Sequence, residues 1–368
     1  MIGYIAQADG APCPTLVLDA AELRGALPSG AHLPGTDLPG AGAEAELRAA
    51  LTGVREWLVA TGRADVLKIA VVAPSPHPLF DLDYRFVQCL PDRLDAFDFQ
   101  GSCGHSILAS LVVAHARRWL PPPAPGDRVR LRILNNGDQI VCEVDESRRQ
   151  GGSFTMYFVQ PPGRSTSRVL MTGRPVDRLT TPSGGYEASL VSLGNPYVFV
   201  DAKELGIGSQ RELFEAGDEV FDELLRIRRS ASALLGLPDT SVFPKVAMVG
   251  AYGPGLLSAR AISVPRWHPT LALTGITCLA AAVTAAGTVP ARLYEETGGR
   301  PPQVGIATPG GGASATARVE DSPRGPVLPW VSVSRKQARI RSGPLAIAPP
   351  GGGDDAATTT RRLNGALH

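Results

Sequence analysis

The stretch Gly101-Ser102-Cys103-Gly104-His105 places a thiol between small residues, at a point where a strand-like run gives way to a helix. The apolar residues after it recur at the three-to-four spacing of a helix, as Ile107, Leu108, Leu111 and Val112 do. Cys103 is therefore expected in the first turn, where unpaired amides and the helix dipole favour a thiolate and bind a carboxylate. The alternative is a buried cysteine that packs as a small hydrophobe.

A second stretch repeats this order. His268-Pro269-Thr270 follows a strand-like run, and Thr274-Gly275-Ile276-Thr277-Cys278 then opens an apolar helical run over 279–286. We infer an internal duplication in which each helix is the centre of one domain, and in which the two helix N-termini face each other across an interdomain cleft. The alternative is that Thr274 only caps a buried helix.

The rest of the chain predicts short strands, most of them bounded by Gly, Pro or Asp. The strand candidates are 67–73, 84–90, 128–134, 139–144, 154–159, 198–201, 245–250 and 331–333, and additional helices are expected over 44–61 and 209–234. We predict an α+β fold of two similar domains, each a mostly antiparallel sheet wrapped around its central helix. The domains are expected over 1–188 and 189–349, followed by a disordered tail over 350–368.

The amino-acid composition argues against several classes of function. The chain has 368 residues, with 36 basic residues against 35 acidic ones and no long run of either sign, which gives no electrostatic footprint for nucleic acid or a membrane surface. The five cysteines, at positions 13, 89, 103, 142 and 278, are widely and irregularly spaced, which argues against a disulfide framework or a zinc site. With no basic, apolar leader at Met1-Ile2-Gly3-Tyr4-Ile5 and no membrane-length apolar run, we expect a soluble cytoplasmic monomer or homodimer that binds a small molecule.

Several blocks of the chain carry a family resemblance. They are Gly194-Asn195-Pro196-Tyr197-Val198-Phe199-Val200-Asp201-Ala202 with Leu205-Gly206, Pro244-Lys245-Val246-Ala247-Met248-Val249, Leu170-Met171-Thr172-Gly173, the Thr274-Gly275 helix start, and Asp83-Tyr84-x-Phe86-x-Gln88. In these blocks and in their order the chain resembles the PrpF family of 2-methylaconitate cis-trans isomerases, whose relatives include methylitaconate isomerases and oxalomesaconate tautomerases. The resemblance implies the diaminopimelate-epimerase fold.

The resemblance also implies two-base or acid–base proton transfer next to a carboxylate, without a metal or an organic cofactor. In the family a lysine on a strand ahead of the cysteine segment acts as the base, and Lys68 in Val66-Leu67-Lys68-Ile69-Ala70 occupies the matching place. A lysine inside an apolar run loses hydration, which lowers its pKa and frees the amine. The alternative is a strand-end lysine whose head reaches water.

The resulting hypothesis is a double-bond isomerase. Lys68 would remove a proton from a carbon conjugated with a carbonyl or carboxylate, and helix amides beside Cys103 and Thr274 would stabilise the dienolate. Cys103 would deliver the proton or orient the intermediate, and the sequence does not decide which group takes the proton and which gives it. The expected substrate-binding residues are Ser102, Gly104, His105, Asn195, His268, Thr274, Gly275 and Thr308.

The chain departs from the family pattern at its charged anchors. The usual Arg-Gly-Gly-Thr-Ser-Lys-Gly loop is replaced by Ala8-Asp9-Gly10-Ala11-Pro12-Cys13-Pro14-Thr15, and Gly-His-Pro-Ser-Gly is replaced by Ala307-Thr308-Pro309-Gly310-Gly311. Because a guanidinium and an imidazole suited to carboxylates are lost, we expect a less anionic and bulkier unsaturated substrate, such as an intermediate of a specialised biosynthetic route. His105 is either a new acid–base group or a residue that makes a structural hydrogen bond.

Two alternatives to the isomerase remain. One is an epimerase or cyclase that uses the same cleft, and the other is a small-molecule-binding protein that has lost its chemistry. An epimerase of the two-thiol kind is disfavoured, because Thr274 stands at the second helix start and Cys278 lies a full turn inside.

Overall fold

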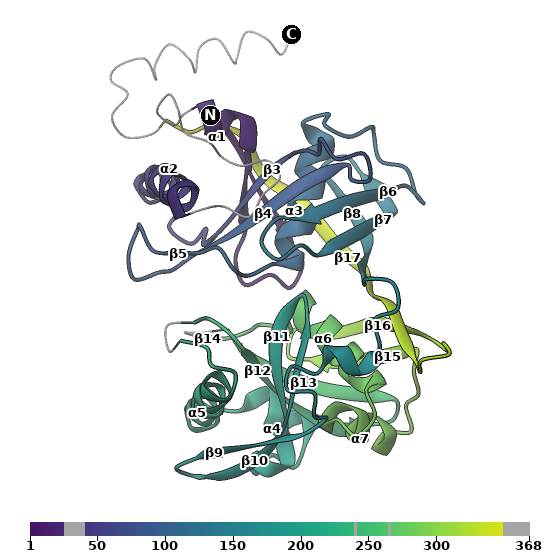
Figure 1. Ribbon diagram of the computed structural model, residues 1–368. Coiled ribbons are helices and arrows are strands. Elements are labelled where there is room, and N and C mark those ends of the chain that lie inside the picture. Colours follow the sequence, from purple (N-terminus) through teal and green to yellow (C-terminus); the bar gives the residue numbers. More distant parts are fainter. Residues whose placement is uncertain (26–40, 239–240, 264–265, 349–368) are drawn as a thin grey trace.

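The computed structural model describes residues 1–25, 41–238, 241–263 and 266–348, so the predicted tail lies outside the described residues. Figure 1 shows two lobes stacked one above the other, with the N-terminus in the upper lobe. The mixed α+β architecture predicted from the sequence is confirmed.

The first lobe is a closed barrel of strands around a central helix. Its strands are β1 (Ile2–Ala8), β2 (Thr15–Asp19), β3 (Lys68–Pro74), β4 (Leu82–Cys89), β5 (Phe97–Asp98), β6 (Arg128–Ile133), β7 (Gln139–Arg148) and β8 (Gly151–Val159), and its helices are α1 (Ala20–Gly25), α2 (Ala41–Ala60) and α3 (Gly104–Ala116). Pairing runs β1-β2-β3-β4-β6-β7-β8, and the last strand of the chain, β17 (Val327–Ala346), joins β8 back to β1. The enclosed helix α3 is buried along Gly104–Ala114.

The second lobe repeats this plan. Its elements are η1 (Thr166–Val169), β9 (Asp177–Thr181), β10 (Gly184–Leu193), β11 (Asn195–Asp201), η2 (Ala202–Leu205), α4 (Gln210–Glu215), α5 (Asp218–Leu234), β12 (Lys245–Gly253), β13 (Leu256–Ser263), β14 (Arg266–Trp267), α6 (Leu273–Thr284), α7 (Val289–Glu296), β15 (Gln303–Thr308), β16 (Gly311–Glu320) and the first half of β17. Pairing runs β10-β11-β12-β13-β15-β16-β17 around the buried α6, and β9 pairs with β10.

The directions of pairing match strand by strand between the lobes. In the first lobe β2 is parallel to β3, β3 antiparallel to β4, β4 parallel to β6, and β6 antiparallel to β7. In the second lobe the same sequence of directions holds for β11, β12, β13, β15 and β16. Helices are inserted at the same place, α2 before β3 and α4 with α5 before β12. The internal duplication inferred from the two helix starts is confirmed by this match.

Strand β17 connects the lobes. Its first half pairs with β16, whereas Lys336–Arg339 pair with β8 and Ala338–Ala346 pair with β1. In Figure 1 this strand runs in yellow from the lower lobe into the upper one. The boundary expected between residues 188 and 189 stays a prediction, but the strand pairing adds the second half of β17 to the first lobe.

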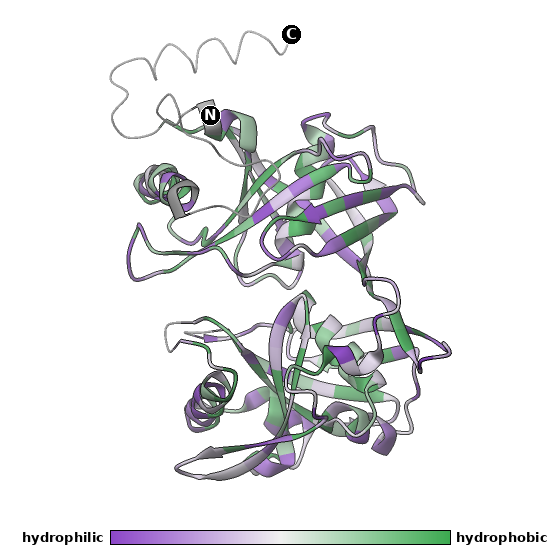
Figure 2. Cartoon of the chain, in the orientation of Figure 1, coloured by the Kyte–Doolittle hydropathy of each residue, from purple (hydrophilic) through white to green (hydrophobic). Residues whose placement is uncertain are grey.

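One predicted helix was wrong in its extent. The region 209–234 holds two helices, α4 and α5, because the chain leaves the helical conformation at Ala216 and restarts after Gly217. Helix α5 packs its buried residues against β9 and β12 and carries charges on its other side. Figure 2 shows these hydrophilic residues along α5.

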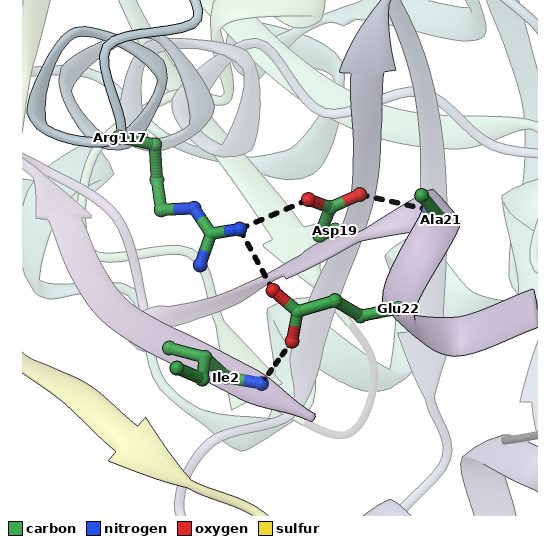
Figure 3. A network of polar contacts seen from close by, with 5 residues as sticks. All are labelled: Ile2, Asp19, Ala21, Glu22 and Arg117. Carbon is green, nitrogen blue, oxygen red and sulfur yellow. Dashed lines mark hydrogen bonds and ion pairs between the residues drawn. The ribbon is translucent and has the colours of Figure 1, made fainter. Parts of the chain in front are cut away.

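A polar network anchors the far end of α3. The Arg117 guanidinium, at the C-cap of α3, forms ion pairs with Asp19 at 3.0 Å and with Glu22 at 2.7 Å (Figure 3). Glu22 also accepts a hydrogen bond from the backbone N–H of Ile2 (Figure 3). The network therefore holds α3 against β1, β2 and α1, and so helps to fix the position of its other end, which carries Cys103.

The described part of the chain contains neither a single membrane-spanning helix nor a cluster of metal ligands. No single helix there is long and apolar enough to cross a membrane, while α6 and α7, bent by 77°, satisfy the length and composition requirement only as a pair. Among the same residues, no group of three or more His, Cys, Asp or Glu side chains is arranged to hold a metal ion.

Candidate active site

The N-termini of the two central helices meet. A Cβ atom built on Gly104, the first residue of α3, would lie 2.7 Å from the Cβ atom of Leu273, the first residue of α6. The facing arrangement expected from the sequence is therefore present. The alternative that Thr274 caps its helix is wrong, because Ala272 occupies the N-cap position and Thr274 lies inside the first turn.

Asn195 joins the two helix starts. Its Oδ1 accepts a hydrogen bond from the N–H of Ser102 at 3.0 Å, and its Nδ2 donates to the carbonyl oxygen of Ser102 at 2.8 Å. Nδ2 also donates to the Thr274 hydroxyl at 3.2 Å. These three contacts engage both polar atoms of a buried side chain, so the structure gives Asn195, Ser102 and Thr274 a positioning role. Their expected contacts with substrate stay predictions.

Lys68 and Cys103 lie together at this junction. Lys68 is the first residue of β3 and is 6 % exposed, and Cys103 is the N-cap residue of α3 with an extended backbone. Burial raises the pKa of the Cys103 thiol, but the charge of Lys68 and hydrogen bonds from Ser106 and Lys68 outweigh it, so that the pKa is lowered. The structure thus brings together the amine and the sulfur that the sequence assigned to catalysis.

Neighbouring hydroxyls support the helix start that carries Cys103. The Ser106 Oγ atom, in the first turn of α3, lies 2.8 Å from Oγ1 of Thr15, which pairs with Lys68 across the parallel strands. The Tyr84 hydroxyl donates to the carbonyl oxygen of Cys103 at 3.3 Å. Strands β2, β3 and β4 are therefore all connected to the first turn of α3, which keeps the thiol close to the amine.

His105 and His268 stack at the same junction. Their ring centroids are 6.2 Å apart with 20° between the planes, and both side chains are buried. Burial, with the charge of Lys68 as the next cause, lowers the pKa of His268 to about 3 and that of His105 well below its usual range. These shifts favour the neutral form of both imidazoles, and the acid–base role of His105 stays a prediction.

Three further groups at the site were missed in the sequence. Burial raises the pKa of Cys13, while the charge of Lys68 opposes the shift, and Cys103 adds to it. Burial lowers the pKa of Lys336, opposed by Asp9, and the charge of Lys336 in turn acts on His105. Lys245, the third, lies within electrostatic reach of Lys68 and Cys103. A lysine at the start of an apolar strand was the signal available for Lys245, as it was for Lys68.

The remaining predicted binding residues have local packing roles in the structure. A Cβ atom on Gly275 would lie 2.7 Å from the Tyr197 ring, so this glycine lets α6 approach β11 closely. The Thr308 hydroxyl donates to the carbonyl oxygen of Gly311 within its own turn, at 2.6 Å. That turn reaches the site through Gly310, which packs on Thr270 two residues after His268. A role of Gly104, Gly275 or Thr308 in binding substrate stays a prediction.

Cys278 has no place among the reactive groups. Its thiol is buried in α6 and donates to the carbonyl oxygens of Asn195 at 3.0 Å and Leu193 at 3.3 Å. Burial raises its pKa to about 12, so it stays a thiol at neutral pH. The second half of a two-thiol pair is therefore not provided by Cys278.

The family model and the related sequences that match this chain point to the same family. The sequence model of a family described as "PrpF protein" matches residues 23–347. A 3-methylitaconate isomerase from Eubacterium barkeri is 26 % identical, with 75 % of this chain and 84 % of the relative covered. A (4E)-oxalomesaconate Delta-isomerase from Novosphingobium sp. (strain KA1) is 28 % identical, with 71 % of this chain and 78 % of the relative covered.

Solved structures agree on the fold. The crystal structure of a methylitaconate-delta-isomerase superposes with a TM-score of 0.65 at 22 % identity and covers 93 % of this chain and 94 % of its own. A hydroxyproline epimerase from Agrobacterium vitis superposes with a TM-score of 0.58 at 14 % identity and covers 94 % of this chain and 93 % of its own. At these identities the likeness concerns the fold, and it confirms the epimerase-like architecture predicted from the sequence.

Proposed function

Because the chain belongs to the PrpF family, and its matched relatives are named isomerases, we propose that it is an enzyme that moves or reorients a carbon–carbon double bond in a small unsaturated carboxylic or carbonyl compound. The observation that carries the proposal is the contact of Lys68 with Cys103 where the first turns of α3 and α6 meet. In the proposed mechanism an amine, a thiol and two sets of helix amides surround one point.

Lys68 is the proton acceptor in this proposal. Its ammonium first passes a proton to the Cys103 thiolate, to which it donates a hydrogen bond. The neutral amine then removes a proton from a carbon next to the conjugated system and becomes an ammonium again. The electron pair of the broken C–H bond moves into a new double bond, and the existing double bond shifts its electrons toward the carbonyl or carboxylate oxygen. A dienolate results, and protonation at another carbon completes the shift without any co-reactant.

The helix ends stabilise that dienolate. The first N–H groups of α3 and α6 have no partners within their own helices, and the positive ends of both helix dipoles converge because Gly104 abuts Leu273. Charge that develops on the substrate oxygen is therefore stabilised more strongly in the intermediate than in the starting acid. Cys103 either returns the proton or holds the intermediate in place.

The charges around the site favour an anionic substrate. Three lysines, at positions 68, 245 and 336, act on the groups of the site, and both histidines are neutral. These amines take over part of the positive charge that the Arg-Gly-Gly-Thr-Ser-Lys-Gly loop supplies in the family. We propose a substrate with at least one carboxylate beside its double bond.

The five free cysteines support the proposed cytoplasmic location, because thiols persist in a reducing compartment.

Deuterium exchange tests this function. The protein is incubated in deuterium oxide with 3-methylitaconate and with (4E)-oxalomesaconate, and the position of the double bond and of the label is followed by NMR. Wild-type protein is expected to shift the double bond and to incorporate deuterium, and Lys68→Ala is expected to lose both. Lys203→Ala is the control, because Lys203 is 53 % exposed and pairs with Glu296 on the surface.

Each other outcome is informative. Exchange retained in Lys68→Ala would remove Lys68 from the mechanism while leaving the activity in place. Tight binding of an unsaturated acid that is recovered unchanged and unlabelled would instead support the non-catalytic alternative.

A further inference from the structure

Lys245 occupies in the second lobe the position that Lys68 has in the first. Lys68 is the first residue of β3 and pairs with Thr15 of the parallel strand β2. Lys245 is the first residue of β12 and pairs with Tyr197 of the parallel strand β11. Thr15 and Tyr197 are in turn the first and third residues of the matching strands, so the two lysines agree in register to within the irregularity of the strand starts.

The Phe243 ring links Lys245 to the segment that carries the thiol. Its Nζ atom lies 5.3 Å from the centroid of the Phe243 ring, and a Cβ atom on Gly101 would lie 3.1 Å from the same ring. The Phe243 ring therefore contacts both the amine of Lys245 and the chain just before Ser102. A cation over an aromatic face is held in position without a carboxylate that would bind its proton.

Charged groups of both lobes, among them Lys68 and Cys103, act on the amine of Lys245. Burial, together with the charges of Arg228 and Lys68, lowers the pKa of Lys245 to about 8, although the charges of Asp98 and Cys103 oppose the shift. An amine with a pKa near the working pH is present in both protonation states, which suits a group that must gain and lose a proton in each cycle. Within the described residues Lys245 takes part in no ion pair of the kind that would fix it as an ammonium.

We propose that Lys245 is the second proton carrier of the reaction and returns a proton to the dienolate from the side of the second lobe. The proposal rests on the isomerase function above and assigns the step left open there. Lys68 takes a proton from one carbon and becomes an ammonium, and the ammonium of Lys245 gives a proton to another carbon and becomes a neutral amine. Exchange with solvent resets both amines, and Cys103 then orients the intermediate.

The duplicated fold explains why one lysine would remove the proton and the other would return it. Moving a double bond requires removal of a proton at one carbon and addition at a different carbon. Two amines that enter from β3 and β12, one from each lobe, serve two carbons of a substrate lying between the lobes. A single amine would have to move from one carbon to the other, and it would return the proton to the same face of the substrate.

The test separates proton transfer from charge. Lys245→Arg keeps a cation that cannot give up its proton in a protein, and Lys245→Gln removes the charge as well. With 3-methylitaconate and (4E)-oxalomesaconate in deuterium oxide, two rates are measured: deuterium entering recovered substrate and appearance of the shifted product. Lys203→Arg on the surface is the matched control, and melting temperatures show that each variant folds.

For Lys245→Arg we expect product formation to fall by about 100-fold or more, as loss of a general acid typically causes, while deuterium still enters recovered substrate through Lys68. Lys245→Gln is expected to show the same split. Product formation at the wild-type rate in Lys245→Arg would overturn the proposal and leave Lys245 as a charge that binds the carboxylate. An equal fall of both rates would also overturn it, because Lys245 would then act before the dienolate forms. Failure of the wild type to shift either double bond would refute the proposed function itself.

Discussion

The carboxamide of Asn195 forms two hydrogen bonds, of 3.0 and 2.8 Å, with the backbone N–H and C=O of Ser102, although 93 residues separate the two residues. Asn195 belongs to β11 of the second lobe, and Ser102 precedes the central helix of the first. A third bond to Thr274 ties the same carboxamide to α6. One side chain thus sets how the two helix starts meet, and with it the place of Cys103.

Asn195→Ala is expected to weaken both the fold and the reaction. The change leaves the buried N–H and C=O of Ser102 without these partners, and an unsatisfied buried polar group costs about 1–3 kcal/mol. Urea denaturation should show a loss of this size, and kcat should fall because the helix starts are no longer held in register. Thr274→Val removes only the third bond and should have the smaller effect on both measurements. Equal effects of the two variants would contradict the idea that the two hydrogen bonds between Asn195 and Ser102 hold the helix starts in place.

Gly104→Ala is expected to push the two helix starts apart. The added methyl group would lie 2.7 Å from the Cβ atom and 3.0 Å from Cδ1 of Leu273, and overpacking of this kind costs about 1–3 kcal/mol. Thermal unfolding should show the loss, together with lower activity. Leu273→Ala in the same chain removes Cδ1 but not Cβ, so it should restore part of the stability and less of the activity. A double-mutant cycle with no coupling between the two changes would contradict the contact.

The reactive pair could be predicted from sequence because local signals mark both members. Cys103 stands between small residues at the start of an apolar helix, and Lys68 stands at the start of an apolar strand. The repeated helix start at Thr274 likewise indicated the duplicated fold. In each case the pattern within about ten residues carries the information, as hydrophobic periodicity does for secondary structure.

The rest depends on contacts between distant parts of the chain. Asn195 reads in the sequence as a substrate-binding residue, and only the pairing across 93 residues shows its partners. The return of β17 into the first lobe likewise has no local signal, because Ala338 is the one buried residue in the second half of this strand and the others are exposed or half-buried. Lys245 lies in one of the sequence blocks that resemble the family. Its proximity to Cys103, however, depends on how the two lobes stack.

The acid stability of the protein is expected to depend on Glu223. Burial alone would raise the pKa of this carboxyl, but hydrogen bonds from Thr181, Ser183 and Arg226 lower it to about 2. A folded-state pKa below the ordinary value of 4.5 means that Glu223 stabilises the fold above about pH 4.5, and that this stabilisation is lost as the pH falls towards 2.

Glu223→Gln should therefore be less stable than wild type at pH 7, and its stability should decline less steeply between pH 5 and pH 2. Denaturant midpoints measured across this range check the slope. Asp218→Asn, at the start of the same helix α5, serves as the comparison for removing one carboxylate. Parallel pH profiles for wild type and Glu223→Gln would show that the carboxylate is not linked to folding.

Alkylation by iodoacetamide should single out Cys103 at neutral pH, because the thiolate is the reactive form and its pKa is the one that the site lowers. Burial raises the pKa of Cys89 and Cys278 to about 12, so both should react far more slowly. Lys68→Met removes the positive charge that lowers the Cys103 pKa. The thiolate fraction at pH 7 then falls, and labelling of the peptide that contains Cys103 should slow and should need a higher pH than in wild type. Lys203→Met, which removes a surface charge, should leave the profile unchanged. If Lys68→Met and wild type showed the same dependence of labelling on pH, the amine and the sulfur would not interact, and the proposed pairing at the helix start would fail.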